Sequence, residues 1–178
     1  MVRVNSHASG RVSSDASAFC GAMKRSIPTI KRKSIESGAK WGARRVRQVI
    51  YNQEYDWEPL SERWLNFKEE NGFDERVYIQ TGEAVRKIRA WEDKNGNWHY
   101  GPRPNARHHS GLMLWQLFRV LEYGSEAANI PARPVWRPVW RELVGADGYL
   151  RRVATTLGDA AARAATQKVR QVRDRRRR

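Results

Sequence analysis

Residues 34–50 read SIESGAKWGARRVRQVI, and their apolar side chains recur every three or four positions. These side chains are Ile35, Ala39, Ala43, Val46 and Ile50. Because an α-helix has 3.6 residues per turn, the pattern places them on one helical face, and Ser34 is a suitable N-cap. Gly38 and Gly42 each lower the helix propensity by about 1 kcal/mol relative to Ala. We therefore predict a helix that depends on packing more than on propensity.

Two basic segments flank the middle of the chain. Residues 1–33 are rich in Ser, Ala and Gly and contain Ile27-Pro28, so they predict a flexible arm with one short helix around residues 16–26. Residues 149–178 predict a basic helix and an Arg tail, with few and mostly small apolar side chains. Because such a helix buries little apolar area, we expect it to pack against another subunit or to stay partly exposed. The remaining residues, 34–148, form the predicted domain.

Shorter patterns fill this domain. A short helix is expected over residues 61–70, where Asn71-Gly72 ends it. Residues 76–80, RVYIQ, favour a β-strand, and residues 83–87 one turn of helix. The Asn-Gly centre of residues 93–97, DKNGN, predicts a β-hairpin.

The last part of the domain is apolar and then rich in proline. Residues 112–123 predict either a buried strand or a core helix, because they are too few to cross a membrane. Pro131, Pro134 and Pro138 exclude a regular helix until after Pro138. A helix is expected to follow Gly148.

Composition limits the class of protein. The chain has 178 residues, 34 Lys and Arg against 19 Asp and Glu, and a net charge of +15. A hydrophobic fraction of 40% can form a core, which excludes disorder throughout the chain. No apolar run approaches the roughly 18–20 residues of a membrane span, and the N-terminus lacks the apolar region of a signal peptide. With Cys20 as the single cysteine, we expect a soluble protein that stays in a reducing cytoplasm.

The charge is distributed unevenly. Residues 1–50 carry +9, residues 51–100 carry −4, and residues 101–178 carry +10. Basic arms on either side of an acidic middle repel each other unless a counter-charge is present. The distribution therefore favours contact with a polyanion or with an acidic protein ring, although a solvated surface has the same composition.

The sequence predicts no catalytic, cofactor or metal site. His99, His108 and His109 are close in sequence to Glu92 and Asp93, but they lack the i, i+4 spacing that places two ligands on one helical face. There is no glycine-rich phosphate loop and no Gly-x-Ser-x-Gly, and Cys20 has no His partner in sequence. We therefore expect that the protein is not an enzyme.

Tryptophan is frequent, with eight residues in the chain. Such side chains can stack on nucleic-acid bases, but in folded proteins they more often anchor a core or an interface. No RRM, KH or zinc-finger signature accompanies them. The sequence therefore indicates a basic interaction protein.

An ordered series of short motifs carries a family resemblance. The series comprises Trp57-x-Pro59-Leu60-Ser61, Lys68-x-x-x-Gly72, Thr81-Gly82 followed by Ile88, the Asn-Gly hairpin, Leu121-Glu122-Tyr123-Gly124-Ser125 and Ile130-Pro131-Ala132-Arg133-Pro134. Over residues 57–141 it resembles the tail-completion or neck proteins of long-tailed bacteriophages, also described as virion morphogenesis or minor tail proteins. In those families the last motif continues with Phe, where this chain has Val135 followed by Trp136.

The resemblance implies an α+β fold, with a small antiparallel β-sheet, a long N-terminal helix and, here, a basic C-terminal helix. It also implies a non-catalytic homo-oligomeric ring of six or twelve copies at the head-to-tail joint, made in the host cytoplasm and located in the virion. Its neighbours there would be portal, adaptor or head-completion proteins and tail terminator or tube proteins. Gly82 and Gly124 are then expected to be backbone hinges.

The resemblance also directs attention to interface and DNA-facing residues. Pro131 and Pro134 would stiffen a segment that presents Arg133 and Trp136, so the subunit-interface candidates are Arg133, Trp136 and Trp140. The DNA-facing candidates in the lumen are Arg175, Arg176, Arg177 and Arg178. The main alternative is a non-specific nucleic-acid-binding protein that uses its basic arms on phosphates, and a nuclease comes third.

Overall fold

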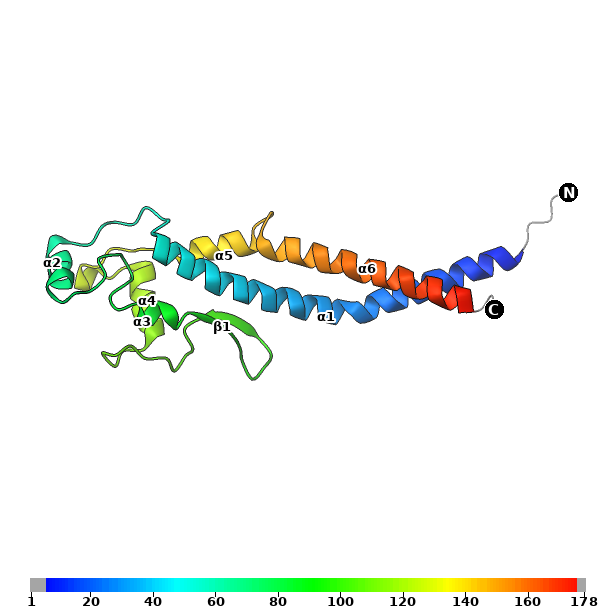
Figure 1. The fold of residues 1–178 in the computed structure, drawn as a ribbon, viewed down its shortest axis with the longest axis horizontal. Helices are drawn as coiled ribbons and strands as arrows, with labels where there is room; N and C mark the ends of the chain where they lie inside the picture. Colours follow the sequence, from blue (N-terminus) through cyan, green and yellow to red (C-terminus); the bar gives the residue numbers. More distant parts are fainter. Residues whose placement is uncertain (1–5, 176–178) are drawn as a thin grey trace. The chain divides into compact units, whose positions relative to one another are not determined.

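The computed structural model describes residues 6–175, apart from the side chains of residues 6–15, 172 and 173 (Figure 1). The elements in chain order are α1 (Ser6–Asn52), α2 (Glu62–Glu70), α3 (Glu83–Arg86), β1 (Arg89–Glu92), β2 (Trp98–Gly101), α4 (Leu114–Tyr123), the 3-10 helix η1 (Glu126–Ala128), α5 (Trp136–Val144) and α6 (Tyr149–Arg175). The long N-terminal helix, the two-stranded antiparallel sheet and the C-terminal helix confirm the predicted α+β class. In the described part of the chain, no helix is both long enough and apolar enough to cross a membrane.

The chain divides into two compact units. The central unit comprises residues 36–149, and the arm unit comprises residues 1–35 together with residues 150–178. The arm unit holds 17 of the 34 Lys and Arg but 3 of the 19 acidic residues, which gives it a formal charge of +14. The central unit carries +1. Nearly all of the net charge therefore belongs to the arm unit, although this unit contains about a third of the residues.

Residues 6–33 of the predicted N-terminal arm are helical, whereas the sequence predicted a flexible segment with one short helix around residues 16–26. Helix α1 begins at Ser6 and continues through Pro28. Residues of α1 between Ala22 and Lys33 line a shared hollow with residues of α6 between Leu157 and Lys168. The small side chains of α6 allow this approach, and Ala165 is buried there. The sequence prediction did not include this contact between α1 and α6. The contact compensates for the cost of placing Pro28 inside a helix.

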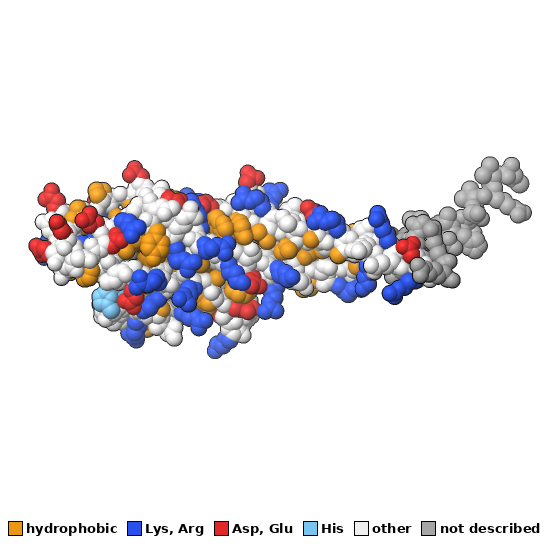
Figure 2. Space-filling model, in the orientation of Figure 1, with side chains coloured by type: hydrophobic (Ala, Val, Ile, Leu, Met, Phe, Trp, Pro, Cys, Tyr) orange, Lys and Arg blue, Asp and Glu red, His pale blue; other side chains and the backbone are white. Residues whose placement is uncertain are grey.

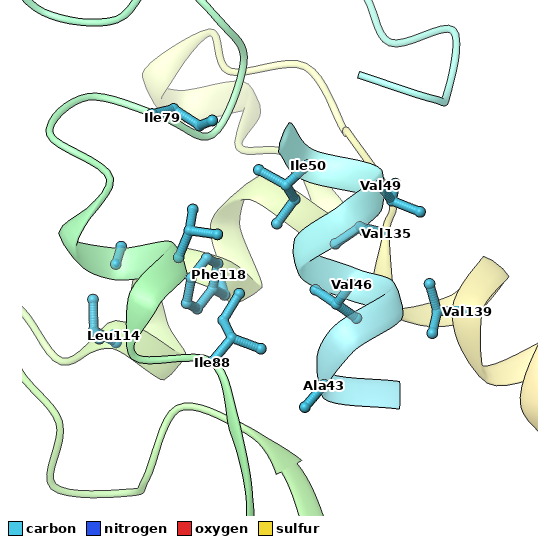
Figure 3. Packing of buried hydrophobic residues seen from close by; sticks show 12 residues of the cluster. Ala43, Val46, Val49, Ile50, Ile79, Ile88, Leu114, Phe118, Val135 and Val139 are labelled. Carbon is cyan, nitrogen blue, oxygen red and sulfur yellow. The ribbon is translucent and has the colours of Figure 1, made fainter. Parts of the chain in front are cut away.

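The core of the central unit forms around the second half of α1. Ala43, Val46 and Ile50 of the predicted apolar face are buried, whereas Ile35 is 40% exposed. Figure 3 shows Phe118 and Ile88 on one side of α1 and Val139 of α5 on the other. The buried cluster also includes Val49, Ile79, Ala84, Val85, Leu114 and Val135. As predicted, this helix depends on the packing of its apolar side chains, because its two glycines have a low helix propensity.

The predicted hairpin is present, because β1 and β2 pair in antiparallel fashion with Trp91 opposite His99. The Asp93 carboxylate accepts hydrogen bonds from the backbone N–H groups of Asn95 and Asn97, at 2.8 and 2.9 Å. The His99 side chain and these bonds hold the pKa of Asp93 well below its usual range. Gly42 of α1 has a close neighbour here, since a Cβ at this position would approach the Tyr100 ring to 3.0 Å.

Residues 76–80, predicted as a strand, form a turn instead. Tyr78 has a φ of +68°, which interrupts an extended conformation. The Gln53 side chain takes the place of a strand partner, since its amide accepts from the Val77 N–H at 3.0 Å and donates to the Val77 carbonyl at 3.1 Å. A single side-chain amide therefore satisfies backbone groups that a neighbouring strand would otherwise bind.

The apolar segment 112–123 becomes the core helix α4, one of its two predicted alternatives. Helix α5 begins at Trp136, whereas the prediction allowed no helix before the end of Pro138. Pro138 is the third residue of α5, in the first turn, where no intrahelical partner for its missing N–H is required. The rule that proline disrupts a helix holds for the helix interior and not for its first turn.

A buried carboxylate fixes the start of α5. Glu122, which is 3% exposed, accepts hydrogen bonds from the backbone N–H groups of Val135, Trp136 and Arg137 at 2.6, 2.9 and 3.0 Å. These are the N–H groups that a helix leaves unsatisfied at its N-terminus, where the helix dipole also favours negative charge. Glu122 is on α4, so this carboxylate joins α4 to α5.

We expect Glu122→Gln to lower the free energy of unfolding by about 2–3 kcal/mol, because a neutral amide cannot accept three backbone hydrogen bonds as the carboxylate does. Urea titration followed by circular dichroism measures the change. Glu126→Gln, at an exposed position of η1, is the matched control and should stay within about 0.5 kcal/mol of the parent. Equal losses in the two variants would contradict the role assigned to Glu122.

Candidate interaction groove

A groove of about 980 Å³ lies in the central unit. Its walls come from the loop before α2, from α2 itself, from residues 77–84, from α4 and from residues 123–133. Most of these segments contain the motifs that carry the family resemblance, so residues far apart in the sequence meet around one surface feature. The hairpin and Ile88 lie outside the lining, while residues of the other motifs take part in it.

The Trp57–Ser61 loop is tied to the Ile130–Pro134 segment. Arg133 is 4% exposed, and its guanidinium donates to the carbonyl oxygens of Glu58 at 2.9 Å and Pro59 at 3.1 Å. The Trp57 indole donates to the Pro134 carbonyl at 3.0 Å, and the Tyr78 hydroxyl donates to the Arg133 carbonyl. Burial raises the pKa of the Tyr78 hydroxyl far above its usual range, so this group stays a donor. The two motifs therefore form one hydrogen-bonded wall.

Lys68, another residue of the groove lining, also binds backbone carbonyls of its own chain. Its ammonium group donates to three backbone carbonyls, those of Asp74, Arg76 and Ile79, at 2.7, 2.8 and 2.5 Å. Burial lowers the pKa of Lys68, and the Asp74 carboxylate opposes that effect. Residues 74–79 contain no strand or helix, so this single side chain replaces a regular hydrogen-bond ladder.

Gly124 permits the tight connection after α4. It has a φ of +78°, and a Cβ there would lie 2.9 Å from both the Ala132 nitrogen and the Ile130 oxygen. The following chain turns back, with Arg133 N–H donating to the Leu121 carbonyl at 2.7 Å. Glycine is therefore required for a close approach of two backbones at this point.

Aromatic side chains and carboxylates surround the opening. Trp64, Phe67 and Tyr123 are 48%, 37% and 62% exposed, and the Trp64 and Phe67 rings lie 4.9 Å apart. The exposed acidic side chains of the lining are Glu58, Glu62 and Glu126, which we call the acidic rim. Figure 2 shows acidic side chains gathered around α2, while Lys and Arg dominate elsewhere on this face. The groove therefore combines exposed aromatic rings with an acidic rim.

Two adjacent histidines lie at the edge of the groove. Glu83, His108 and His109 each offer one potential ligand atom within 4.8 Å of the others. The Glu83 carboxylate already accepts a hydrogen bond from the Lys87 ammonium at 2.5 Å, which holds the pKa of Glu83 below its usual range. Burial and the neighbouring His109 lower the pKa of His108.

The sequence associated these histidines with His99, but His99 lies in the hairpin. There the His99 Nε2 atom lies 3.0 Å from Asp93 Oδ2, in a hydrogen bond, and the His99 ring stacks on the Trp91 ring with the centroids 4.3 Å apart. The Lys87 ammonium, which also donates to the Arg107 carbonyl, competes with any cation for Glu83. The expected absence of a metal site stays a prediction.

The structure separates the three predicted interface residues. Arg133 is buried and bound to its own chain, so the expectation of a presented guanidinium requires correction. Trp136 is half-buried between Phe118 and Tyr100, with ring centroids 5.6 and 5.9 Å away, and therefore belongs mainly to the core. Trp140 is 52% exposed and remains available as an interface anchor. The proline segment presents neither of its two expected side chains.

Val135 is fully buried, and Trp136 beside it supplies an aromatic ring to the core. Of the four DNA-facing candidates, Arg175 is exposed at the end of α6. Arg176, Arg177 and Arg178 lie outside the described residues.

Sequence reasoning missed Trp64, Phe67 and Tyr123 as groove residues. The sequence of α2 does indicate two of them, because Trp64 and Phe67 are three residues apart and share one helical face. This face contains few other apolar side chains that could cover the two rings. The other side of the groove required knowledge of the fold, because Tyr123 is distant in sequence. No family model, curated protein or solved structure matches the chain.

We expect Trp136→Ala to lower the free energy of unfolding by about 2–4 kcal/mol, because it removes a ring that packs on Phe118 and Tyr100. Trp140→Ala should change it by no more than about 0.5 kcal/mol, because that ring is largely exposed. Thermal unfolding of the two variants provides the comparison. If Trp136→Ala were as stable as Trp140→Ala, Trp136 would not be a core residue.

Proposed function

We propose that the protein is a structural subunit of a bacteriophage head-to-tail joint, a neck or tail-completion protein that forms a ring between the head connector and the tail. One observation carries the proposal: three of the motifs that resemble the phage families, at residues 57–61, 121–125 and 130–134, are joined by hydrogen bonds in the fold. Arg133 of the last motif binds the backbone of the first, and the second contributes Lys68 to the same groove. Parts that are mutually required are expected to occur together and in a fixed order.

The surface of the central unit is compatible with such an assembly. Besides the groove, it exposes Leu112, Trp115, Trp140 and Val144. Trp140 and Val144 are four residues apart on α5 and therefore share one exposed helical face, which supports a role as an interaction surface. The prominent buried charges, in contrast, bind the chain's own backbone, as Lys68, Arg133 and Glu122 do. We therefore assign the protein a binding role and not a catalytic one.

A ring of six or twelve copies requires two different, complementary surfaces on each subunit, because head-to-tail contacts close when the rotation per copy divides a full turn. The copies would contact portal, adaptor or head-completion proteins on one side and tail terminator or tube proteins on the other. The virion is then the site of action.

Native mass spectrometry and negative-stain electron microscopy of the purified protein test this proposal. We expect closed rings whose fraction increases with protein concentration. Trp140→Ala should weaken assembly at least tenfold, as expected for an aromatic anchor, while Lys94→Ala, a change in the hairpin turn, should not. A protein that stays monomeric at every concentration would contradict the ring.

A second function is favoured by the +14 charge of the arm unit, which is suited to non-specific contact with DNA phosphates. In a neck, the genome end passing through the lumen would supply this counter-charge. We expect weak binding to duplex DNA, without sequence preference, that falls steeply between about 50 and 200 mM salt.

Deletion of residues 175–178 should flatten the salt dependence, because each lost phosphate contact removes about 0.9 from the logarithmic slope on duplex DNA. Fluorescence anisotropy with a labelled duplex measures it. Arg44→Ala with Lys94→Ala, two exposed positions of the central unit, provides the control. An unchanged slope in the deletion variant would show that the tail does not contact DNA.

A further inference from the structure

The groove of the central unit carries negative charge in a protein of net charge +15, and the carboxylates at its opening are available. None of Glu58, Glu62 and Glu126 forms an ion pair with any residue that the structure describes. The two cations of the lining, Lys68 and Arg133, are buried and bound to backbone carbonyls. An occupant therefore has to present apolar surface to Trp64 and Phe67 and positive charge to the acidic rim.

The arm unit presents a surface of this kind. Lys24, Ile27, Lys31 and Ile35 follow one another on α1 at spacings of three, four and four residues, so they share one helical face, which we call the α1 stripe. Ile27 and Ile35 are 57% and 40% exposed. Both lysines are exposed as well, so the stripe places an apolar side chain between two cations.

Among the residues that the structure describes, the other helix of the arm unit leaves Ile27 and Ile35 of the α1 stripe 57% and 40% exposed. The residues of α1 that line the hollow shared with α6 are Ala22, Arg25, Ser26, Thr29, Ile30 and Lys33. At about 100° per residue, these positions lie on the opposite side of the helix from Ile27 and Lys31. Packing in the arm unit therefore leaves the stripe open to another molecule.

We propose that the α1 stripe of one copy docks in the acidic-rimmed groove of the next copy. Lys24 and Lys31 would pair with the acidic rim, while Ile27 would contact the exposed rings of Trp64 and Phe67. This inference rests on the proposed ring, because it assigns that ring its two complementary surfaces. Charge complementarity selects the occupant: one chain carries both an open cationic stripe and a groove whose unpaired charges are all negative. A contact between two different surfaces of the same chain repeats from copy to copy.

Charge reversal on each surface tests the docking. The groove variant is Glu62→Lys with Glu126→Lys, and the stripe variant is Lys24→Glu with Lys31→Glu; all four positions are exposed. The matched controls are Glu69→Lys with Glu70→Lys, on α2 outside the groove lining, and Arg44→Glu with Lys94→Glu. Circular dichroism and thermal unfolding establish that each variant is folded.

Sedimentation velocity at about 50 and 300 mM NaCl gives the readout, because salt screens contacts between exposed charges. At the lower salt concentration we expect the groove variant and the stripe variant to self-associate at least tenfold more weakly than the parent. Both controls should associate like the parent. At the higher salt concentration the parent itself should associate more weakly, and the difference between the parent and the two variants should shrink.

An equimolar mixture of the groove variant and the stripe variant should associate again. The groove variant keeps an intact stripe and the stripe variant keeps an intact groove, so the native contact forms between the two chains. The reversed stripe and the reversed groove also carry opposite charges, which allows further copies to add in alternation. Association in the mixture but in neither variant alone is the specific signature of this docking.

The outcomes separate this inference from the ring on which it rests. If the parent forms rings and both variants still assemble like it, the ring stands and the docking is wrong. If the mixed variants stay monomeric while each is folded, the docking is also wrong. A parent that is monomeric at every concentration removes the ring and the docking together.

Discussion

Three buried charged side chains hold the central unit together by binding backbone, and the rest of that unit depends on them. Lys68 satisfies three carbonyls, Arg133 satisfies two, and Glu122 satisfies three N–H groups. Regular structure cannot take over this role, because the sheet has two strands of four residues and long connections separate the helices. Buried backbone groups without partners are costly, so charged side chains provide the partners. These hydrogen bonds fix the positions of the connecting segments, and the groove lies between the fixed segments.

This arrangement explains which features could be predicted from the sequence. The helix around Val46, the Asn-Gly hairpin and the helix around Trp64 depend on local periodicity or on turn residues, and all three are present. Residues 76–80 have the composition of a strand, but Gln53 and Lys68 bind their backbone from elsewhere in the chain. Local composition carries no information about such distant partners, and the prediction therefore failed where long-range hydrogen bonds decide the conformation.

The same distinction applies to the candidate site. An Arg between two prolines predicts a presented side chain, yet the Arg133 guanidinium is directed to the loop at Glu58. Trp136 and Trp140 are equivalent in sequence, but one packs against Phe118 and the other is exposed. A residue at the right place in a motif can thus serve the fold, the surface or both. Burial, which the sequence does not report, decides between these roles.

The separation of charge between the two units follows from the way each is stabilised. The central unit needs carboxylates as well as cations, because its buried groups and its ion pairs, such as Arg45 with Glu142, require both signs. In the arm unit, α1 and α6 meet around small α6 side chains such as Ala161 and Ala165, and Lys and Arg side chains occur even beside this contact. A +14 unit joined to a +1 unit is costly in isolation through self-repulsion, and the cost falls when a counter-charge approaches. A neighbouring copy's acidic rim and a DNA duplex would provide such a counter-charge at different parts of the arm, so the two proposed contacts are compatible in one assembly.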